Sequence, residues 1–369
     1  MRTQAAVLWE RGGPWSIEDV DVAPPAGRGV LVELAASGLC HSDDHCVTGD
    51  MPVPLPLIGG HEGAGTVIEV GPDASRVRPG DHVILTPLPS CGACRWCASG
   101  RANLCDAGAA AMSPESYDGA YRYEVKGEAV PSFVHLGTFS RHVVVSEWQT
   151  VVIEPDIPLD IASLVGCGVS TGWGAAVKVA EVVPGDTVVV VGTGGVGVNA
   201  VQGARLAGAA LIMAVDPIAF RRDAALSLGA HVAVESVDEA ARQLAELTRG
   251  VMADKVIVCV GVLYGDLVGP ISELVSKGGR LVITSVTPMH ETNVALALGM
   301  FAMSNKSLLG HVFGQVNPAA DFPRLLALYR SGALRLDELI TRRYPLAQIN
   351  EGYADMHAGR TVRGLVEHG

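Results

Sequence analysis

Residues 187–197 read Thr-Val-Val-Val-Val-Gly-Thr-Gly-Gly-Val-Gly, a β-branched apolar run followed at once by a Gly-x-Gly-x-x-Gly turn. In a strand–turn–helix unit that binds a dinucleotide, the first glycine permits the tight turn, the second lets the backbone approach a pyrophosphate, and the third lets helix and strand pack closely. Gly192, Gly194 and Gly197 hold these positions. Gly195 and Val196 then open a helix whose first N–H groups are available to phosphates. The stretch therefore predicts a dinucleotide-binding turn.

The residue expected to contact the adenosine ribose is Asp216, which ends the next apolar run, 19 residues after Gly197. A carboxylate there accepts hydrogen bonds from the ribose hydroxyls and repels a 2′-phosphate, which favours NAD over NADP. Arg221 and Arg222 follow closely and argue weakly for NADP, because basic side chains accommodate that phosphate. The alternative interpretation is an ordinary glycine-rich turn followed by an aspartate that caps a helix.

Around this turn, apolar runs alternate with segments of helical spacing. We expect buried strands at 187–191, 211–215, 256–260 and 281–286, and helices at 196–207, 221–228 and 237–248. Continuous apolar runs are typical of parallel strands that are covered by helices on both faces. The β-α-β-α order predicts an α/β fold with a doubly wound parallel sheet, the Rossmann arrangement, in this part of the chain.

Roughly the first 160 residues show a different pattern, in which short apolar runs are separated by Gly, Pro and Asp. Examples of these runs are residues 30–34, 65–70 and 81–85. They favour an antiparallel, barrel-like region. Beyond residue 313 we expect a helix at 321–330 and a short final strand at 361–367. The sequence therefore predicts a mainly-β catalytic domain, residues 1–168 and 313–369, with the α/β domain, residues 169–312, inserted into it.

Charge and composition exclude several classes of protein. The 369 residues include 27 basic and 39 acidic side chains, a net charge of −12, which argues against a nucleic-acid binder. Apolar residues make up 49%, enough for a large core. No apolar stretch approaches the roughly 20 residues of a membrane span, and the N-terminal residues lack the apolar core of a signal peptide. We expect a cytoplasmic protein with neither nucleic-acid nor membrane partners.

Four cysteines lie close together with the spacing C-x2-C-x2-C-x7-C: Cys91, Cys94, Cys97 and Cys105. Four thiolates can close tetrahedrally around zinc and leave no open position, which is the property of a structural site. The bacterial iron–sulfur pattern instead ends in C-x3-C-P, and here the last gap is longer and Asp106 follows. A redox C-x-x-C motif leaves two cysteines unexplained, and a nucleic-acid zinc module conflicts with the negative charge. The lobe at 91–105 therefore predicts structural zinc.

Three further candidate ligands are far apart in the chain: Cys40, His61 and Cys167. Two thiolates and one imidazole would leave zinc one open position for a substrate. Each residue also has a simpler explanation. A lone cysteine often packs as a small apolar side chain, and a lone histidine often satisfies a turn. Spacing alone therefore does not establish this second site.

The chain resembles the zinc-dependent medium-chain alcohol dehydrogenases over essentially its whole length. The resemblance is carried by Gly-x-Cys-His-Ser-Asp at 38–43, Gly-His-Glu-Gly-Ala-Gly at 60–65, the four-cysteine lobe, Gly-Cys-Gly-Val-Ser-Thr-Gly at 166–172 and Gly-Thr-Gly-Gly-Val-Gly at 192–197, all in family order. It implies a GroES-like catalytic domain with an inserted Rossmann NAD-binding domain. The stretches 8–10, 14–16 and 248–260 are similar to the actinobacterial nitrosodimethylaniline-dependent enzymes, which are nicotinoproteins that keep NAD bound.

The resemblance implies a reaction in which primary alcohols are oxidised reversibly to aldehydes by hydride transfer from a zinc-bound alkoxide to NAD. It assigns the catalytic zinc to three ligands: Cys40, His61 and Cys167. Glu62 would tune the zinc or act as a transient ligand, and a purely structural carboxylate is the alternative. Asp43 would orient the ligand histidine, or merely cap a helix. Ser42 would accept the alcohol proton, which would leave through a ribose hydroxyl and then His45 at the protein surface.

The resemblance also implies contacts with the cofactor. Thr171 would contact the nicotinamide, His41 and Arg363 the pyrophosphate, and Arg221 the adenosine end. Two zinc ions and one NAD are expected in each chain, with a small alcohol or aldehyde as substrate. The resemblance further implies a homo-oligomer, a dimer or a tetramer, that assembles through the nucleotide-binding domain.

Two other functions stay open at this stage. The first is a formaldehyde dehydrogenase that acts on a thiol adduct, a branch on the same scaffold whose anionic substrate needs basic anchors. Residues 106–120 hold no Lys or Arg, which disfavours it, but Arg122 and Lys126 keep it open. The second is a non-catalytic protein that binds NAD and zinc. The joint presence of the candidate ligands with Ser42 and His45 argues against it.

Overall fold

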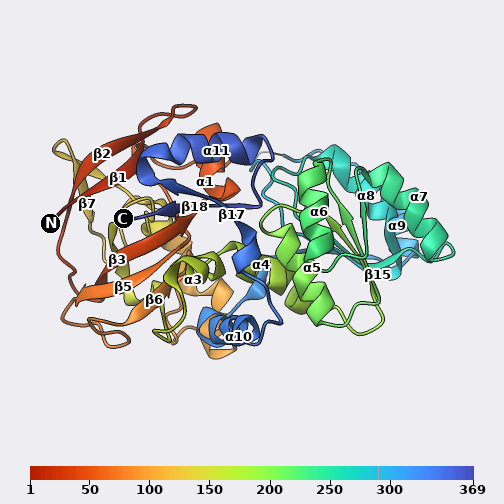
Figure 1. Ribbon diagram of the computed structural model, residues 1–369, viewed down its shortest axis with the longest axis horizontal. Helices are drawn as coiled ribbons and strands as arrows, with labels where there is room; N and C mark the ends of the chain where they lie inside the picture. The colour runs from red at the N-terminus through yellow and green to blue at the C-terminus, as the bar shows by residue number, and fades with distance from the viewer. Residues whose placement is uncertain (290) are drawn as a thin grey trace. The chain divides into compact units, whose positions relative to one another are not determined.

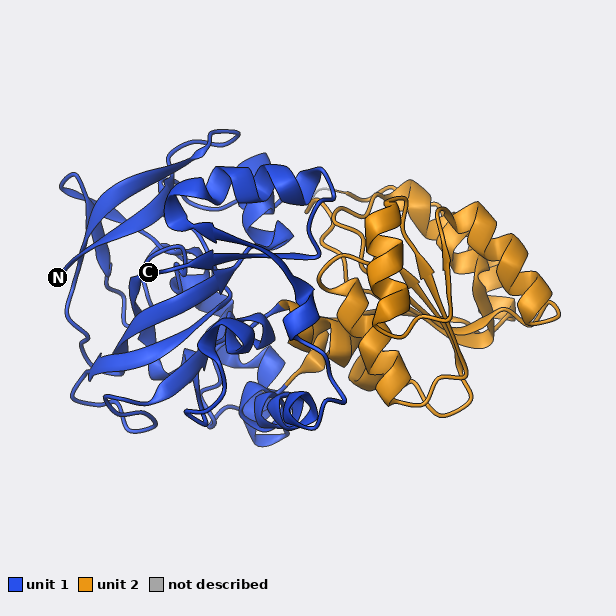
Figure 2. Ribbon diagram, viewed as in Figure 1, with its two compact units in different colours: residues 1–167, 317–369 blue, residues 168–316 orange. Residues whose placement is uncertain are grey.

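The computed structural model describes residues 1–289 and 291–369. The chain forms two compact units (Figure 2). Unit 1 consists of residues 1–167 and 317–369, and unit 2 consists of residues 168–316. The chain thus leaves unit 1 once, builds unit 2 without interruption, and returns to complete unit 1. Within the described residues, no helix is both long enough and apolar enough to cross a membrane.

Unit 2 is built on a six-stranded sheet with the order β13-β12-β11-β14-β15-β16. The strands are β11 (Thr187–Val191), β12 (Leu211–Val215), β13 (Val232–Val234), β14 (Ala253–Val258), β15 (Val275–Ile283) and β16 (Ser307–Gly310). All neighbouring strands run parallel. This is the Rossmann order, in which two halves meet between the first and fourth strands, here β11 and β14. The predicted doubly wound sheet is confirmed.

Helices cover both faces of this sheet (Figure 1). They are α4 (Gly168–Gly174), α5 (Gly197–Leu206), α6 (Ala219–Ser227), α7 (Val237–Leu247), α8 (Val268–Glu273) and α9 (Leu298–Met303). Val190 packs in one apolar cluster with Val201 of α5, whereas Val189 packs in another with Leu244 of α7. Successive strand residues point to opposite faces, so burial of both faces requires the uninterrupted valine run that the sequence shows.

Two predicted strands are displaced in the structure. The run at 256–260 was expected to be a strand, but β14 ends at Val258. Beyond it the backbone of Val260 passes so close to Gly192 that a Cβ on the glycine would lie 2.7 Å from the Val260 nitrogen. The run at 281–286 was also expected, but β15 begins six residues earlier, at Val275. Val275 pairs with Ala253 and Arg280 with Lys255, and the polar residues 276–279 lie in the irregularity between these pairs, which an apolar pattern does not reveal.

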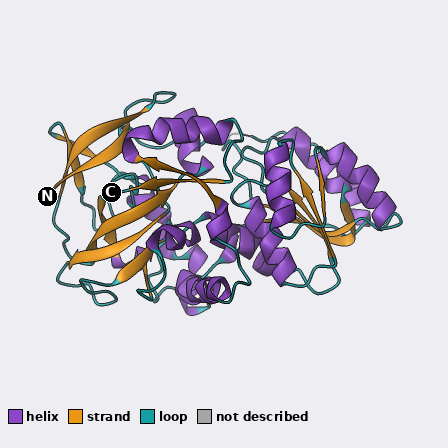
Figure 3. Cartoon of the chain, in the orientation of Figure 1, coloured by secondary structure: helices purple, strands orange, loops and turns teal. Residues whose placement is uncertain are grey.

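Unit 1 contains two sheets (Figure 3). One has the order β4-β1-β2-β7-β8, with strands β1 (Arg2–Leu8), β2 (Trp15–Val22), β4 (Leu57–Ile58), β7 (Tyr123–Val125) and β8 (Glu128–Val130). The other has the order β10-β6-β5-β3-β18-β17, with β9 also paired to β3. Its strands are β3 (Gly29–Gly38), β5 (Gly63–Val70), β6 (His82–Leu85), β9 (His142–Ser146), β10 (Thr150–Ile153), β17 (Ile340–Pro345) and β18 (Arg363–Glu367).

The second segment of unit 1, residues 317–369, adds strands β18 and β17 to the larger sheet. The helices of unit 1 are α1 (His41–Thr48), α2 (Arg95–Ala98), α3 (Leu159–Val165), α10 (Pro318–Arg330) and α11 (Ile349–His357). Strand β18 pairs antiparallel with β3, with Leu365 opposite Gly38. This pairing brings Arg363 of the last strand next to the residues that follow β3. Two segments more than 300 positions apart therefore frame one site.

Candidate active site and cofactor site

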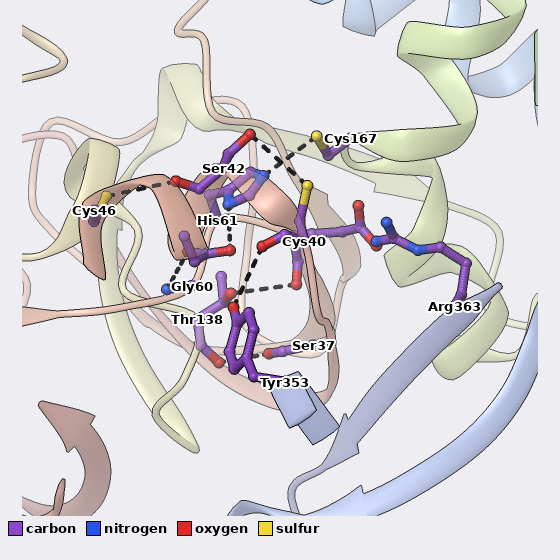
Figure 4. Close-up of polar contacts among 12 residues, drawn as sticks. Ser37, Cys40, Ser42, Cys46, Gly60, His61, Thr138, Cys167, Tyr353 and Arg363 are labelled. Carbon is purple, nitrogen blue, oxygen red and sulfur yellow. Dashed lines mark hydrogen bonds and ion pairs between the residues drawn. The ribbon is translucent and has the colours of Figure 1, made fainter. Parts of the chain in front are cut away.

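The three isolated candidate ligands meet inside unit 1 (Figure 4). Cys40 is the extended residue between β3 and α1, with φ −134°. His61 lies between β4 and β5, and Cys167 follows α3. The two sulfur atoms and a ring nitrogen of His61 all lie within 4.8 Å of one another. Residues that the sequence leaves far apart thus form one buried donor group.

The chemistry of this donor group fits zinc. His61 Nε2 lies 3.3 Å from the sulfur of Cys167. A hydrogen bond from the Cys167 thiol brings the pKa of Cys40 well below its usual value despite burial, and the charges of His61 and Arg363 act in the same direction. The same sulfur–sulfur contact, together with burial, raises the pKa of Cys167. Both shifts favour the negative charge on Cys40 over Cys167, and thiolate and imidazole are the donors that zinc prefers.

Asp43 orients the ligand histidine. Its Oδ2 lies 2.9 Å from Nδ1 of His61, and its Oδ1 accepts a 2.8 Å hydrogen bond from the Gly60 N–H. Burial raises the pKa of Asp43. Burial by itself would lower the pKa of His61, but the charges of Asp43 and Cys40 outweigh it and raise that pKa well above the usual value. With Nδ1 directed at a carboxylate, Nε2 faces the two sulfurs, which is the usual outer partnership of a metal-binding histidine.

A second buried ion pair lies beside the ligands. Arg363 pairs with Glu62, and the exposed fractions of the two side chains are 5% and 0%. Burial opposes the charge of Arg363, but Glu62 and the neighbouring sulfurs raise its pKa above the ordinary value. Gly38 is obligatory here, because a Cβ at that position would lie 1.8 Å from Oε1 of Glu62. The absence of a side chain at the end of β3 therefore makes room for this pair.

Of the two residues predicted to move the proton, Ser42 lies in the first turn of α1 and His45 in the last. Sγ of Cys40 lies 3.8 Å from Oγ of Ser42, so the serine hydroxyl borders the donor group. The expectation that His45 lies at the protein surface is wrong, because this residue is only 1% exposed. The C-terminal end of α1 folds back over the imidazole, and Nδ1 lies 3.2 Å from Oδ2 of Asp50.

Several residues around the donor group carry no signal that the sequence alone could reveal. The ring of Phe133 meets the imidazole of His61 edge-on, with centroids 5.5 Å apart. The hydroxyl of Tyr353 donates to the backbone oxygen of Cys40 over 3.4 Å, and Thr138 Oγ1 donates to that of Glu62 over 3.2 Å. Phe133 and Thr138 come from one segment and Tyr353 from another more than 200 residues away, so only the tertiary structure brings them to the site.

The four cysteines of the lobe form the second donor group, again with all sulfurs within 4.8 Å of one another. Backbone N–H groups point at the sulfurs. The Cys94 N–H donates to Cys91 Sγ over 3.4 Å, and the Cys97 N–H donates to Cys94 Sγ over 3.5 Å. Hydrogen bonds from the N–H groups of Cys97 and Asp106 lower the pKa of Cys94 to about 6. Burial raises the pKa values of Cys97 and Cys105. Four converging cysteine sulfurs fit a closed zinc site.

The lobe is tied to the larger sheet through Glu147. This fully buried carboxylate accepts hydrogen bonds from the backbone N–H groups of Ser75 and Arg76, at 2.7 and 2.9 Å. Burial opposes the negative charge, but these hydrogen bonds outweigh it and lower the pKa of Glu147. The guanidinium of Arg76 in turn donates to the backbone oxygens of Ser90 and Cys91, at 2.5 and 2.6 Å. The first cysteine of the lobe is thereby fixed to the rest of unit 1.

In unit 2, the glycine turn has the geometry of a phosphate-binding loop. Gly192 has a left-handed backbone, with φ +85°. A Cβ on Gly197 would lie 1.9 Å from the backbone oxygen of Gly192, so the third glycine permits the close packing of strand and helix. A Cβ on Gly194 would meet no protein atom within 4 Å. The middle glycine thus faces open space, as the approach of a pyrophosphate requires. Gly195 and Val196 complete the turn and lead into α5.

Asp216 is the residue expected to contact the ribose of the cofactor. It follows β12 and is 2% exposed. Its Oδ2 accepts the N–H of Thr193 over 2.8 Å, and its Oδ1 accepts the N–H of Ile218 over 2.9 Å. Thr193 also donates through its hydroxyl to the backbone oxygen of Arg221, over 3.4 Å. The glycine turn, the acidic residue and the start of α6 are therefore joined by hydrogen bonds.

The other predicted cofactor residues are distributed over both units. Thr171 lies on α4, next to Gly172, where a Cβ would come within 2.1 Å of the Val196 backbone oxygen. Helix α4 thus packs tightly against the glycine turn. His41 begins α1, and its ring centroid lies 6.5 Å from that of His357.

A Rossmann sheet combined with a β-rich unit that carries a two-sulfur, one-imidazole site defines a zinc-dependent nucleotide-linked dehydrogenase. Comparison with known families agrees. The model for the alcohol dehydrogenase GroES-like domain matches residues 26–156, and the model for zinc-binding dehydrogenases matches residues 195–331. The chain belongs to the zinc-dependent alcohol dehydrogenase family. It is an oxidoreductase of small-molecule alcohols that uses zinc and a nicotinamide-type cofactor.

Individual relatives support the same assignment over the full length. The NDMA-dependent alcohol dehydrogenase of Amycolatopsis methanolica is 45% identical over 100% of this chain and 99% of its own. Alcohol dehydrogenase B of Mycobacterium tuberculosis H37Rv is also 45% identical, with the same coverage. A solved alcohol dehydrogenase zinc-binding domain protein from Burkholderia ambifaria has a TM-score of 0.93 at 31% identity, covering 100% of this chain and 99% of its own. Benzyl alcohol dehydrogenase from Acinetobacter calcoaceticus has a TM-score of 0.92 at 27% identity, with both chains fully covered. The resemblance expected from the motifs is confirmed.

Proposed function

We propose that Cys40, His61 and Cys167 hold a catalytic zinc ion and that the four-cysteine lobe holds a second, structural one. The observation that carries this proposal is the convergence of each donor set within 4.8 Å. Three donors leave a fourth position for the alcohol oxygen, whereas four donors close the site. When bound, the catalytic zinc supplies a Lewis acid that lowers the pKa of an alcohol. Glu62 is absent from the donor group and pairs with Arg363, which supports a tuning role for this carboxylate.

The chain's own residues hold the reacting groups in place. Asp43 fixes the orientation of His61, so that its Nε2 faces the sulfurs of Cys40 and Cys167 as the third zinc donor. Ser42 borders the donor group and takes the alcohol proton on its hydroxyl oxygen, and His45 passes a proton outward. Proton removal by chain residues lets the alcohol deliver hydride to the cofactor, which carries the redox chemistry.

The cofactor that we propose is NAD, bound on the glycine turn of unit 2. The open space beside Gly194 supports the placement of the pyrophosphate. The carboxylate of Asp216 supports NAD over NADP, because it repels a 2′-phosphate. The resemblance assigns Thr171 to the nicotinamide and Arg221 to the adenosine end. It assigns His41 and Arg363 to the pyrophosphate.

We further propose that NAD stays bound through turnover and is reoxidised by an external acceptor. The NDMA dependence in the name of the Amycolatopsis methanolica relative supports this behaviour. A near-ultraviolet spectrum of desalted protein tests it without added cofactor. A primary alcohol should produce the band of reduced nicotinamide. Appearance of the band only after NAD is added would contradict permanent binding, while leaving the dehydrogenase function intact.

Primary alcohols are the proposed substrates. The thiol-adduct alternative depends on free basic anchors, and the two candidates are engaged elsewhere. Arg122 pairs with Asp118, and Lys126 pairs with Glu18 at 3.0 Å. Steady-state oxidation of ethanol and benzyl alcohol should therefore exceed oxidation of formaldehyde with added glutathione. A strict requirement for the thiol would reverse this assignment.

Three serine variants test the two zinc sites. Cys40→Ser should reduce zinc from two ions per chain to one and abolish alcohol oxidation, with the fold retained. Cys91→Ser should lose the other ion and destabilise the protein. Cys46→Ser is the matched control, because Cys46 is also buried on α1 but lies outside both donor groups. Turnover by Cys40→Ser at the wild-type rate would contradict the catalytic assignment, and one zinc in the wild-type protein would support a non-catalytic function.

The domain roles and cellular location are also proposals. We assign zinc chemistry to the domain of residues 1–168 and 313–369 and NAD binding to the domain of residues 169–312. A cytoplasmic location is supported by the eight cysteines, all of which are free thiols.

We propose a homo-oligomer, a dimer or tetramer, formed through unit 2. Large apolar side chains on α9 and β16 are between 45% and 84% exposed: Leu298, Met300, Met303 and Leu308. Strand β16 also ends the sheet, and an apolar edge strand favours pairing with a second chain. Leu308→Glu should lower the mass measured by light scattering, whereas Leu226→Glu on α6, 43% exposed, should not. A monomeric wild-type protein would refute the assembly.

A further inference from the structure

A buried histidine cannot exchange a proton with bulk water unless a partner connects it to the solvent. His45 is 1% exposed, and Nδ1 of its ring lies 3.2 Å from Oδ2 of Asp50. The side chain of Asp50 is 21% exposed, ten times the fraction for the imidazole at 2%. We propose that Asp50 is the outlet of the proton path, accepting the proton from His45 and releasing it to water. The inference rests on the proposed function, in which His45 moves the alcohol proton.

The end of α1 fixes Asp50 in this position. Gly49 ends the helix in a left-handed conformation, with φ +84°, which reverses the chain immediately before Asp50. The N–H groups of Gly49 and Met51 both donate to the backbone oxygen of His45, at 3.0 and 3.1 Å. Asp50 is thus bracketed by two hydrogen bonds to the residue that its side chain faces. The positive φ at position 49 disfavours any larger residue, and a Cβ there would also require the side chain of Arg11 to move.

The carboxylate of Asp50 is also oriented by its own neighbour. Thr48 Oγ1 donates to Oδ2 of Asp50 over 2.7 Å. The same oxygen faces His45, so the hydroxyl and the imidazole converge on a single acceptor atom. An exposed aspartate would ordinarily sample several rotamers. This hydrogen bond favours the one rotamer in which Oδ2 faces the ring nitrogen.

Of the charged groups near His45, Asp50 has the carboxylate that faces the imidazole ring. Asp44 lies on the same helix, but its carboxylate is paired with His357 of α11 at 2.8 Å. Arg11 lies against Gly49 and adds a positive charge at the end of the helix. Nδ1 of His45 faces the Asp50 carboxylate at 3.2 Å. The proton leaving Nδ1 therefore moves toward a carboxylate that is itself in contact with solvent.

The proton step balances without a further reactant. A proton arrives on one ring nitrogen of His45, and the ring then carries N–H on both nitrogens. The N–H bond at Nδ1 breaks, and the proton binds Oδ2 of Asp50, leaving the imidazole neutral in its other tautomer. Asp50 then loses the proton to water and returns to the carboxylate. No group is oxidised or reduced. A flip of the imidazole ring then turns its remaining N–H toward Asp50, which readies the pair for the next turnover.

The test uses the full-length enzyme with zinc and NAD bound, mixed with a primary alcohol in a stopped-flow instrument. Absorbance of reduced nicotinamide and the colour of phenol red report hydride transfer and proton release in the same experiment. We expect Asp50→Asn to slow proton release about 100-fold, the low end of what a positioned acid–base group contributes. Millimolar imidazole in the buffer should restore the rate, and Asp50→Glu should retain most of it. Asp44→Asn is the matched control and should release the proton at the wild-type rate.

The outcomes separate this inference from the function on which it rests. Proton release by Asp50→Asn within twofold of wild type, with His45→Gln clearly slowed, would overturn the role of Asp50 alone. No slowing in His45→Gln would overturn the proton path itself. A slow Asp50→Asn that imidazole does not rescue would show a purely structural role and would also overturn the proposal.

Discussion

The buried ion pair between Glu62 and Arg363 makes a quantitative prediction for Glu62→Gln. The substitution keeps the shape of the side chain and removes its charge, which leaves a guanidinium that is 5% exposed without its counter-charge. Removing one partner of a buried ion pair typically costs about 3–5 kcal/mol, because the remaining charge stays desolvated. The sulfurs of Cys40 and Cys167 also favour the charged form of Arg363 and offset part of the loss. We therefore expect Glu62→Gln to lower the free energy of unfolding by about 3 kcal/mol, the low end of this range.

The expected shift in melting temperature follows from the size of unit 1. Unit 1 comprises roughly 220 residues. At about 2.1 cal/mol/K per residue, its unfolding entropy is about 0.46 kcal/mol/K, so 3 kcal/mol corresponds to roughly 6–7 °C. Tryptophan fluorescence is the suitable probe, because four of the five tryptophans lie in unit 1: Trp9, Trp15, Trp96 and Trp148.

Two controls make this prediction specific. Glu338→Gln breaks an exposed pair with Arg335, 2.6 Å long, and should change stability by less than about 1 kcal/mol. The double variant Glu62→Gln/Arg363→Met removes both charges and should be markedly more stable than the sum of the single effects predicts. All proteins are compared at equal zinc content. A Glu62→Gln variant within 1 °C of wild type, or strictly additive effects in the double variant, would refute the reasoning.

Three further predictions concern other parts of the molecule. Asp43→Asn weakens the orientation of His61 and should reduce the affinity of the catalytic site for zinc about 10–100-fold, measured by competition with a chelator. Gly197→Ala forces a Cβ to within 1.9 Å of the Gly192 backbone oxygen, so we expect loss of NAD binding and a lower melting temperature in calorimetry. Glu147 has a pKa below its ordinary value of 4.5, so its stabilisation is complete above that value and is lost as the pH falls through the folded-state pKa. Urea denaturation should therefore show that Glu147→Gln costs stability at pH 7 and much less near pH 3, and an equal cost at both pH values would contradict this.

The nucleotide-binding half of the fold could be predicted from the sequence because its rules are local. A strand buried on both faces needs a continuous apolar run, and residues 187–191 supply one directly before the glycine turn. The polar start of β15 escaped prediction, because residues 276–279 lie in an irregularity between the paired residues Val275 and Arg280 and show no apolar pattern. In unit 1, the short strands follow no single period, and the order of the two sheets depends on long-range pairing.

The two donor groups also differ in how far the sequence alone predicts them. The four-cysteine lobe lies within one short segment, so spacing alone predicts that its thiols converge. Cys40, His61 and Cys167 are separated by whole strands and helices, and only their resemblance to a family joined them before the structure brought their donor atoms within 4.8 Å. The burial of His45 was not foreseen, because it depends on how the chain turns after α1.

The sequence by itself determined the Rossmann sheet, the glycine turn, the acidic residue after β12 and the four-cysteine lobe, because each depends on side chains that are neighbours along the chain. Only the tertiary structure decided that Arg363 meets Glu62 and that Asp50 faces His45. Strand β18 must pair with β3 before the first contact exists, and α1 must end in a left-handed glycine before the second does. Such contacts depend on the path of the backbone through space, which no local pattern of residues encodes.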